Sequence, residues 1–241
     1  MEFLEYLLLV LVGFGSGFVQ RVSGFGLSIF AMLFLPHFMP SHTAAAVVAC
    51  LLSCSTTTFN AIKFRKAVAY KTVIPMTVAA LVTIPIAVYF SSAVSARVFK
   101  ILLGAVLVLL SLYFIFLGKR VKLRPTIASS IFSGTLSGVL GGLFSTSGPP
   151  AVLYLTNATS ENVTYFATVQ FYFCITNLYT TATRAISGMI DLEMLLYSAV
   201  GIIGCMAGDF LGSKVFKRLN GEMLKKVIYV GMIISGVIMF L

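Results

Sequence analysis

The sequence predicts an all-α integral membrane protein, and three observations lead to this prediction. Hydrophobic residues make up 59% of the 241-residue chain and charged residues only 10%, whereas an average soluble domain has about 25% charged residues. The mean hydropathy is +1.03. Apolar runs recur from end to end, and several reach the roughly 20 residues that cross a bilayer as a helix. We therefore expect one membrane-embedded unit without a separate soluble domain.

Ten apolar segments, separated by polar or breaker-rich joints, make up most of the chain. They cover residues 3–20, 26–35, 43–62, 68–90, 95–117, 126–140, 149–156, 163–187, 192–213 and 223–241. The first is similar to a signal peptide, but Glu2 and Glu5 stand where a signal peptide is basic, and no small-residue cleavage site follows. We expect it to be retained. The basic residues lie in short loops, which is typical of membrane topology and argues against a nucleic-acid partner despite the net charge of +10.

The order of the segments predicts two repeats, residues 1–118 and 119–241. The first half opens VGFGSGFVQRVSGFG and the second SGTLSGVLGGLFSTSGPP, so that a Ser-Gly pair recurs and Gly26 corresponds to Gly148. A basic linker, GKRVKLRP, separates the halves. Each half is then one broken, glycine-rich segment followed by three unbroken ones, which is the pattern of an internal duplication.

The broken segment of each half is its most informative element. The glycines there are Gly13, Gly15, Gly17, Gly24 and Gly26 in the first half, and Gly134, Gly138, Gly141, Gly142 and Gly148 in the second. Because each interior glycine costs a helix roughly 1 kcal/mol relative to alanine, we expect no continuous helix through either run. Close helix packing is the alternative, and it suits Gly13, Gly17, Gly134 and Gly138. It does not explain the polar clusters QRVS and STS, since unwound backbone at membrane depth needs protein or a polar cavity around it.

The basic residues distinguish two topologies. If each broken segment crosses the membrane once, they divide nine against seven, which is no bias. If each is a re-entrant hairpin that returns to its starting side, they divide thirteen against three, as the positive-inside rule requires. The minority side then holds Arg97, Lys100 and Arg184. We therefore predict inverted repeats, with both termini in the periplasm and the linker Lys119–Arg124 in the cytoplasm.

Inverted repeats with broken helices place a binding site at mid-membrane, between the breaks. Gly26 and Gly148 each precede an apolar arm, Pro149 suits the first helical position of the second arm, and Ser147 suits its N-cap. Two helix N-termini would then direct N–H groups and positive dipole ends at the centre, where they bind anions. Arg21 adds a permanent charge beside one of them. An ionisable residue inside a membrane is a functional candidate, and the alternative is that Arg21 snorkels to the interface.

Polar residues on the following segments are secondary candidates. Gln170 and Asn177 are seven residues apart and share one face of the 163–187 helix. Ser53, Thr57 and Asn60 share a face of segment 43–62. Hydrogen bonding between helices explains these residues equally well.

The remaining reactive residues predict no catalysis. Asp209 is expected to pair with Lys214 or cap a helix rather than carry protons, and His37 and His42 are expected to be exposed. The four cysteines, Cys50, Cys54, Cys174 and Cys205, lie in apolar runs and are interpreted as packing residues. Since neither a metal-binding spacing nor a catalytic motif occurs, we expect no cofactor and no enzyme activity.

The stretches GFGSGFVQRVSGFG and SGVLGGLFSTSGPPAVLYL resemble the TauE/SafE family of sulfite exporters, and the duplicated layout of that family covers the whole chain. The first stretch departs from the family's usual adjacent glycines, because Phe25 interrupts it. The resemblance implies a secondary carrier in a bacterial inner membrane that exports a small sulfur-containing anion, such as sulfite or an organosulfonate like sulfoacetate. A passive anion channel, or an importer of another small organic anion, is the alternative. The predicted substrate-binding residues are Gln20, Arg21, Ser23, Gly24, Phe25, Gly26, Ser145, Thr146, Ser147, Gly148, Gln170 and Asn177.

Overall fold

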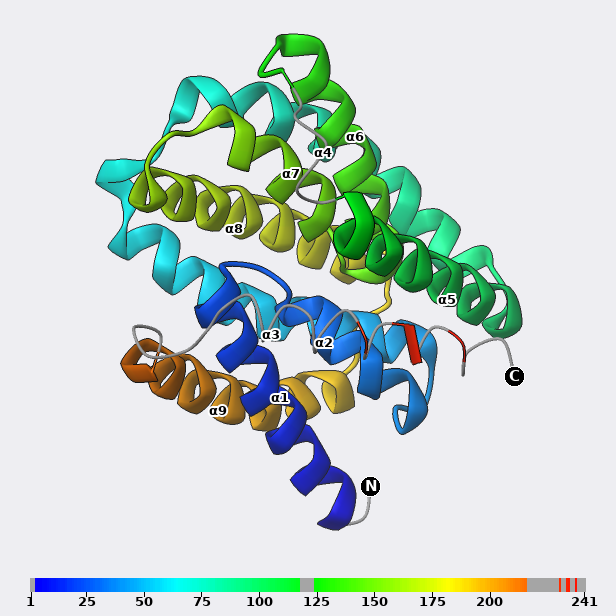
Figure 1. Cartoon of the computed structure of the whole chain (residues 1–241). Helices are drawn as coiled ribbons and strands as arrows, with labels where there is room; N and C mark the ends of the chain where they lie inside the picture. The colour runs from blue at the N-terminus through cyan, green and yellow to red at the C-terminus, as the bar shows by residue number, and fades with distance from the viewer. Residues whose placement is uncertain (1–2, 118–123, 216–229, 231–232, 235–236, 238–241) are drawn as a thin grey trace.

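The computed structural model of the chain describes residues 3–117, 124–215, 230, 233–234 and 237, and every regular element within them is a helix (Figure 1). The α-helices are α1 (Phe3–Ser23), α2 (Leu27–Phe34), α3 (His42–Lys63), α4 (Tyr70–Ala93), α5 (Ala96–Leu112), α6 (Ile127–Phe144), α7 (Gly148–Ala158), α8 (Asn162–Ile186) and α9 (Leu192–Val215). Short 3-10 turns cover Leu35–His37 and Arg65–Ala67, and a π turn covers Tyr113–Leu117.

Five helices, namely α1, α3, α4, α6 and α9, are long and apolar enough to cross a membrane by length and composition. The prediction of an all-α integral membrane protein is thus confirmed. The first nine predicted segments each coincide with a helix, and the tenth, 223–241, lies largely outside the described residues. Polar caps set several helix starts: Ser41 Oγ accepts the Ala44 N–H at 3.0 Å, and Thr126 caps α6 together with Ser129.

The breaks are shorter than the glycine pattern predicts. The first helix runs without interruption past Gly13, Gly15 and Gly17 and ends only at Ser23, and α6 likewise continues through its glycines to Phe144. A break is therefore present in each run, as predicted, but the expectation that the earlier glycines also interrupt the helix is wrong. Only residues 24–26 and 145–147 interrupt the two segments.

The glycines of α1 allow close contact with α9, which explains why the helix tolerates them. A Cβ on Gly13 would overlap the carbonyl oxygen of Gly201, and a Cβ on Gly17 would overlap that of Cys205. Gly208 makes the reciprocal approach from α9 to the backbone of α1. Because residue numbers rise together along both helices in these contacts, α1 and α9 run parallel.

The same packing joins α6 to α4. A Cβ on Gly134 would overlap the carbonyl oxygen of Met76, and a Cβ on Gly138 would lie too close to the carbonyl oxygen of Ala80. These two helices are also parallel, since both residue numbers rise together. The packing explanation is therefore correct for the glycines in the interiors of both helices.

Helices α3 and α8 meet at the centre of the bundle and run antiparallel. Cys50 Sγ lies 3.4 Å from Thr181 Oγ1, and Cys174 Sγ lies 3.6 Å from Thr58 Oγ1. Residue numbers therefore fall along α8 as they rise along α3. The division into repeats at residue 118 and the re-entrant course of the breaks stay predictions.

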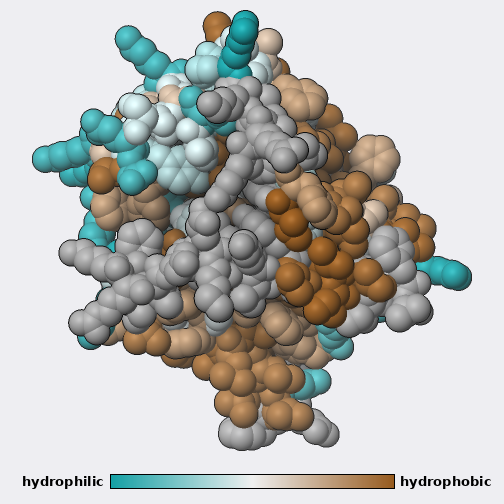
Figure 2. All heavy atoms as spheres, in the orientation of Figure 1, coloured by the Kyte–Doolittle hydropathy of each residue, from teal (hydrophilic) through white to brown (hydrophobic). Residues whose placement is uncertain are grey.

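Apolar residues cover the right and lower parts of the face in Figure 2, as expected of a protein surrounded by lipid. Large hydrophobic side chains point outward, including Val82 (64% exposed) and Ile203 (69% exposed). Hydrophilic residues gather at the upper left of the view, over the connection between α3 and α4 (Figure 2). Apolar side chains that face outward, with polar residues gathered at one edge of the view, suit a protein that lies in a bilayer.

Candidate functional site

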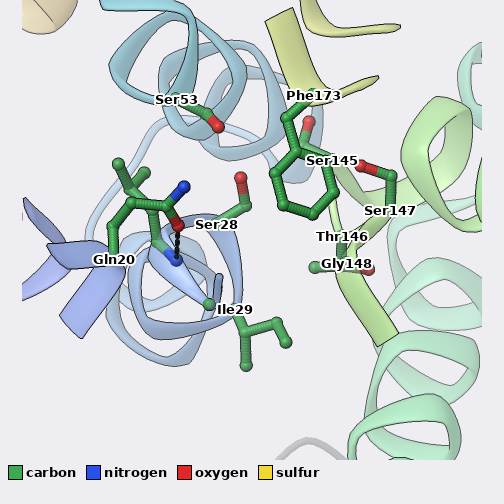
Figure 3. Close-up of a pocket in the computed structure, with 11 residues that line it drawn as sticks. Gln20, Ser28, Ile29, Ser53, Ser145, Thr146, Ser147, Gly148 and Phe173 are labelled. Carbon is green, nitrogen blue, oxygen red and sulfur yellow. Dashed lines mark hydrogen bonds between the residues drawn. The ribbon is translucent and has the colours of Figure 1, made fainter. Parts of the chain in front are cut away.

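A small polar cavity lies between the break after α1 and the break after α6 (Figure 3). The first break lies on one side of the cavity and the second on the other, with α3 and α8 completing the wall. Its free volume is about 20 Å³, which is room for a single water molecule. The lining residues are Gln20, Gly26, Leu27, Ser28, Ile29, Ser53, Ser145, Thr146, Ser147, Gly148 and Phe173.

Glycine makes the turn from α1 into α2. Gly24 and Gly26 have φ angles of 80° and 99°, a left-handed conformation that glycine adopts at no steric cost. The Gln20 side chain closes this turn, because its Oε1 accepts the Leu27 N–H at 3.2 Å. From α8, Gln170 Nε2 donates to the Gly24 carbonyl oxygen at 3.0 Å. The first break is thus held by two buried amides.

The N-terminus of α2 faces the cavity. The first N–H groups of a helix have no acceptor within the helix, and in α2 Gln20 caps only that of Leu27. Ser28 and Ile29, which follow in the first turn, lie in the cavity wall. The positive end of the α2 dipole is therefore directed at this space.

The second break depends on Ser145, which has a φ of 59° and is the one non-glycine residue with positive φ in the described part of the chain. Its N–H bonds to the Gly141 carbonyl oxygen at 2.9 Å, and the Thr146 N–H bonds to that of Leu140 at 3.3 Å. This is the hydrogen-bond pattern of a helix that ends in a left-handed residue. A serine in this strained region suggests that its side chain has a specific role.

Two details of the second arm differ from the sequence prediction. Ser147 occupies the N-cap position of α7, but its side chain makes no capping hydrogen bond. Pro149 is the second residue of α7 rather than the first, because the helix begins at Gly148, and Pro150 follows it. Since proline has no N–H, the α7 terminus offers fewer backbone donors than the α2 terminus.

Arg184 lies near the end of α8, and at the sequence level it counted only toward topology, on the side with few basic residues. It is 1% exposed. Its guanidinium donates to the carbonyl oxygens of Ala46 (2.8 Å) and Gly142 (3.0 Å) and to Ser145 Oγ (2.8 Å). These acceptors are neutral, Nε has no hydrogen-bond partner, and no carboxylate of the described chain is among the neighbouring groups. The permanent positive charge therefore acts, through Ser145, on the cavity wall.

Arg21 does not line the cavity. Its Nη1 donates to Asn60 Oδ1 at 3.1 Å, and its Cζ lies 5.9 Å from the centre of the Phe166 ring. Asp209, on α9, is near enough for the two charges to interact. Arg21 therefore joins α1 to three other helices close to the first break.

The expected pairing of Asp209 with Lys214 and the expected exposure of His42 are both wrong. Asp209 does not pair with Lys214, whose Nζ instead lies 4.4 Å from the centre of the Phe210 ring. His42 is half-buried and stacks on Phe99 with ring centres 4.4 Å apart. His37 is exposed, as expected.

The predicted residues Gln170 and Asn177 lie one layer behind the cavity wall. Gln170 accepts from Gln20 Nε2 at 3.4 Å, and Asn177 Nδ2 donates to Ser53 Oγ at 2.8 Å. Each amide therefore positions a residue that lines the cavity. The interhelical hydrogen bonds that were the alternative explanation are present in both cases.

The rest of the first break serves packing and local bonding. Ser23 Oγ donates to the Val19 carbonyl oxygen at 2.7 Å, within α1. The Phe25 ring packs against Gly148, so that the two breaks touch, and a Cβ on Gly148 would meet it at an ordinary 3.5 Å.

The cavity offers hydrogen-bond donors and no charged side chain of its own. Thr146 Oγ1 is buried without a partner. No group of three or more metal-ligating side chains occurs in the described part of the chain. Hydroxyl groups, a helix N-terminus and a buried cation behind them suit a small anion rather than a metal ion.

Comparison with known proteins gives one match. Residues 9–239 match the family model described as sulfite exporter TauE/SafE. Neither the curated proteins nor the solved structures gave a match.

Proposed function

Because the chain belongs to the TauE/SafE sulfite exporter family, it is a multi-pass membrane protein of a transporter family, and we propose that it exports a small sulfur-containing anion across a bacterial inner membrane. Export of a monoanion from a negative interior gains about 2.3 kcal/mol per 100 mV. No coupling ion is then required. The same family membership supports a carrier rather than an enzyme.

The anion binds in the cavity between the α2 and α7 termini. The single observation that carries this proposal is the convergence of the two breaks, far apart in sequence, on one buried polar space with Arg184 behind it. The α2 N-terminus supplies backbone donors, and Ser28 and Thr146 supply hydroxyls. The unpartnered Thr146 Oγ1 has a hydrogen bond to gain, whereas the Ser145 hydroxyl already donates to the Ala46 carbonyl oxygen at 2.6 Å.

Arg184 compensates the charge of the bound anion. A dehydrated anion inside a membrane needs an opposite charge, and the cavity lining has none. The Arg184 guanidinium is one hydrogen bond from Ser145, which does line it. Arg21, by contrast, is engaged with Asn60 outside the wall.

Helix directions support the proposed re-entrant breaks. Leu52 of α3 packs on Gly201 of α9, and Asn60 lies near Asp209, so α3 runs parallel to α9 and hence to α1. The chain must therefore return through α2 between two parallel helices. In the second half, Ser137 bonds to Tyr172 and Gly142 to Arg184, so α6 and α8 are parallel and the chain returns through α7.

The antiparallel course of α3 and α8 supports inverted repeats. These helices occupy the same place in each proposed half, and a two-fold axis in the membrane plane makes such equivalents antiparallel. The contacts between the halves agree with this symmetry. In the proposed repeats α1 corresponds to α6 and α9 to α4, and α1 packs on α9 just as α6 packs on α4. Lys63, Lys71 and Lys214 then share one side, and Arg97 and Lys100 lie on the other, as the positive-inside rule requires.

The lining also bears on the substrate. It has no carboxylate, so the ammonium group of a zwitterion such as taurine would have no partner there. Room for one water means that the wall must move to admit an anion. Sulfite, the smallest candidate, requires the least movement and is our first choice.

A flux assay in proteoliposomes tests this function. The panel is sulfite, sulfoacetate, taurine and thiosulfate, each measured with the purified chain and with empty vesicles. We expect saturable sulfite efflux and no taurine efflux. Transport of none of the anions would contradict the proposal, and single-channel conductance would identify a passive channel instead.

A further inference from the structure

Two thiols of α3 face one point on α8, next to the cavity but outside its wall. Cys50 and Cys54 are four residues apart and therefore share a helix face. Their Sγ atoms lie 3.4 Å and 3.5 Å from the same atom, Thr181 Oγ1. Neither is in a disulfide. The packing interpretation of the cysteines does not require two sulfurs to converge in this way.

A positive charge lies beside this pair. Arg184 donates to Ser145 Oγ, and both residues are neighbours of Cys50. The guanidinium bonds only to neutral oxygens. The surroundings of the thiol pair therefore stabilise a group that carries negative charge.

We propose that Cys50 and Cys54 form a two-coordinate binding site for a soft monovalent metal ion of the Cu(I) class. Thiolates select such ions over harder ones, and two sulfurs on successive turns of a helix can hold one ion between them. No third cysteine, histidine or carboxylate of the described chain completes a larger cluster here. A four-coordinate zinc site is therefore not formed.

The binding step balances without a change of oxidation state. Two S–H bonds break, two S–Cu(I) bonds form, and two protons leave to solvent. The product, two thiolates and one monovalent cation, carries a single negative charge. The positive charge of Arg184 offsets this charge in a region without a competing carboxylate.

The site adjoins the cavity without belonging to it. Ser53 lines the cavity and stands between the two cysteines in sequence. Asn177 connects the thiol pair to the cavity wall, because its carbonyl oxygen accepts from Cys50 Sγ and its Nδ2 donates to Ser53 Oγ. Cys174, by contrast, bonds Thr58, and Cys205 faces Leu52. Cys205 is a matched control within the same chain, and Cys174, which lies near Cys54, tests whether a third thiol contributes.

Anaerobic titration of the purified full-length chain with Cu(I), against the competing chelator bicinchoninate, tests the site. We expect one tightly bound ion per chain, with release of two protons. Cys50→Ala and Cys54→Ala should each weaken binding by at least about 100-fold, since loss of a direct ligand costs no less than loss of its supporting partners. Cys174→Ala and Cys205→Ala should bind as the parent does.

Three results would overturn the proposal: no tight binding by the parent chain, undiminished binding by the Cys50/Cys54 double variant, or equal loss in Cys174→Ala. Gel filtration checks that each variant is folded. If the buried Cys50→Ala variant does not fold, Cu(I) binding by the variant at the partly exposed Cys54 tests the site instead. Sulfite flux by the double variant is measured separately, so that a failed metal site and a failed transport proposal give different results.

Discussion

Replacement of Arg184 by glutamine tests the charge that compensates the bound anion. The variant removes the cation but keeps an amide that can still donate to one of the former acceptors, Gly142 or Ser145. Ser145 Oγ accepts from Arg184 at 2.8 Å, so an anion in van der Waals contact with Ser145 lies roughly 6 Å from the guanidinium. At an effective dielectric constant of about 20, two unit charges at that distance attract by about 3 kcal/mol.

Since about 1.4 kcal/mol corresponds to a factor of ten, Arg184→Gln should weaken anion binding by roughly 100-fold. Arg184→Lys should recover about half of this free energy, because the charge survives but the planar fork does not. The measurement is the sulfite concentration dependence of efflux from proteoliposomes, with the amount of reconstituted protein matched. Arg21→Gln is the control and should change the apparent affinity by less than about threefold, since Arg21 lies outside the cavity wall.

Parental affinity in Arg184→Gln would refute the electrostatic reasoning. A large loss of sulfite affinity in Arg21→Gln, together with a small loss in Arg184→Gln, would mean that Arg21 compensates the charge of the anion.

Three further perturbations follow from the packing, the unpartnered hydroxyl and the charge pattern. Gly17→Val and Gly138→Val should each lower stability by about 1–3 kcal/mol or more, because a side chain would overlap the neighbouring backbone; thermal unfolding measures this, with Gly148→Ala as a tolerated control. Thr146→Val keeps the shape but removes an unpartnered hydroxyl, so unfolding should be unchanged while sulfite affinity falls about tenfold; a loss of stability with normal affinity would contradict the assignment. A chain whose four cysteines are replaced should transport at the parental rate and serves as the background for labelling. In this background, an impermeant thiol reagent added from outside should label a cysteine introduced at Ser41 and should not label one introduced at Val121. The reverse pattern would reject the inverted topology.

Much of the fold follows from hydropathy alone. Apolar runs predict the positions of α1 to α9 because a helix is the one element that satisfies its own backbone in lipid. The interpretation of the glycines was less successful. Gly13 and Gly17 lower the helix propensity of α1, but they allow close packing against α9, which offsets this loss of stability. A single sequence does not say which helix will be the neighbour.

The sequence predicted where the candidate site lies, but it did not identify the buried charged residue beside it. The polar runs next to Gly26 and Gly148 predict that both breaks border one site, and both line the cavity. Arg184 escaped notice because it stands near the end of an apolar segment, where hydropathy does not distinguish an exposed terminus from a buried one. Its burial depends on α3 and α6, which meet it through Ala46 and Gly142.

The position of a bound anion tests the central claim most directly. Selenite is a heavier analogue of sulfite, and its anomalous scattering locates selenium in crystals of the cysteine-free chain, in which no thiol reacts with it. We predict one peak between the α2 and α7 termini, within hydrogen-bonding distance of Ser28 or Thr146. A peak beside Arg21 and Asn60 with the cavity empty would contradict this account.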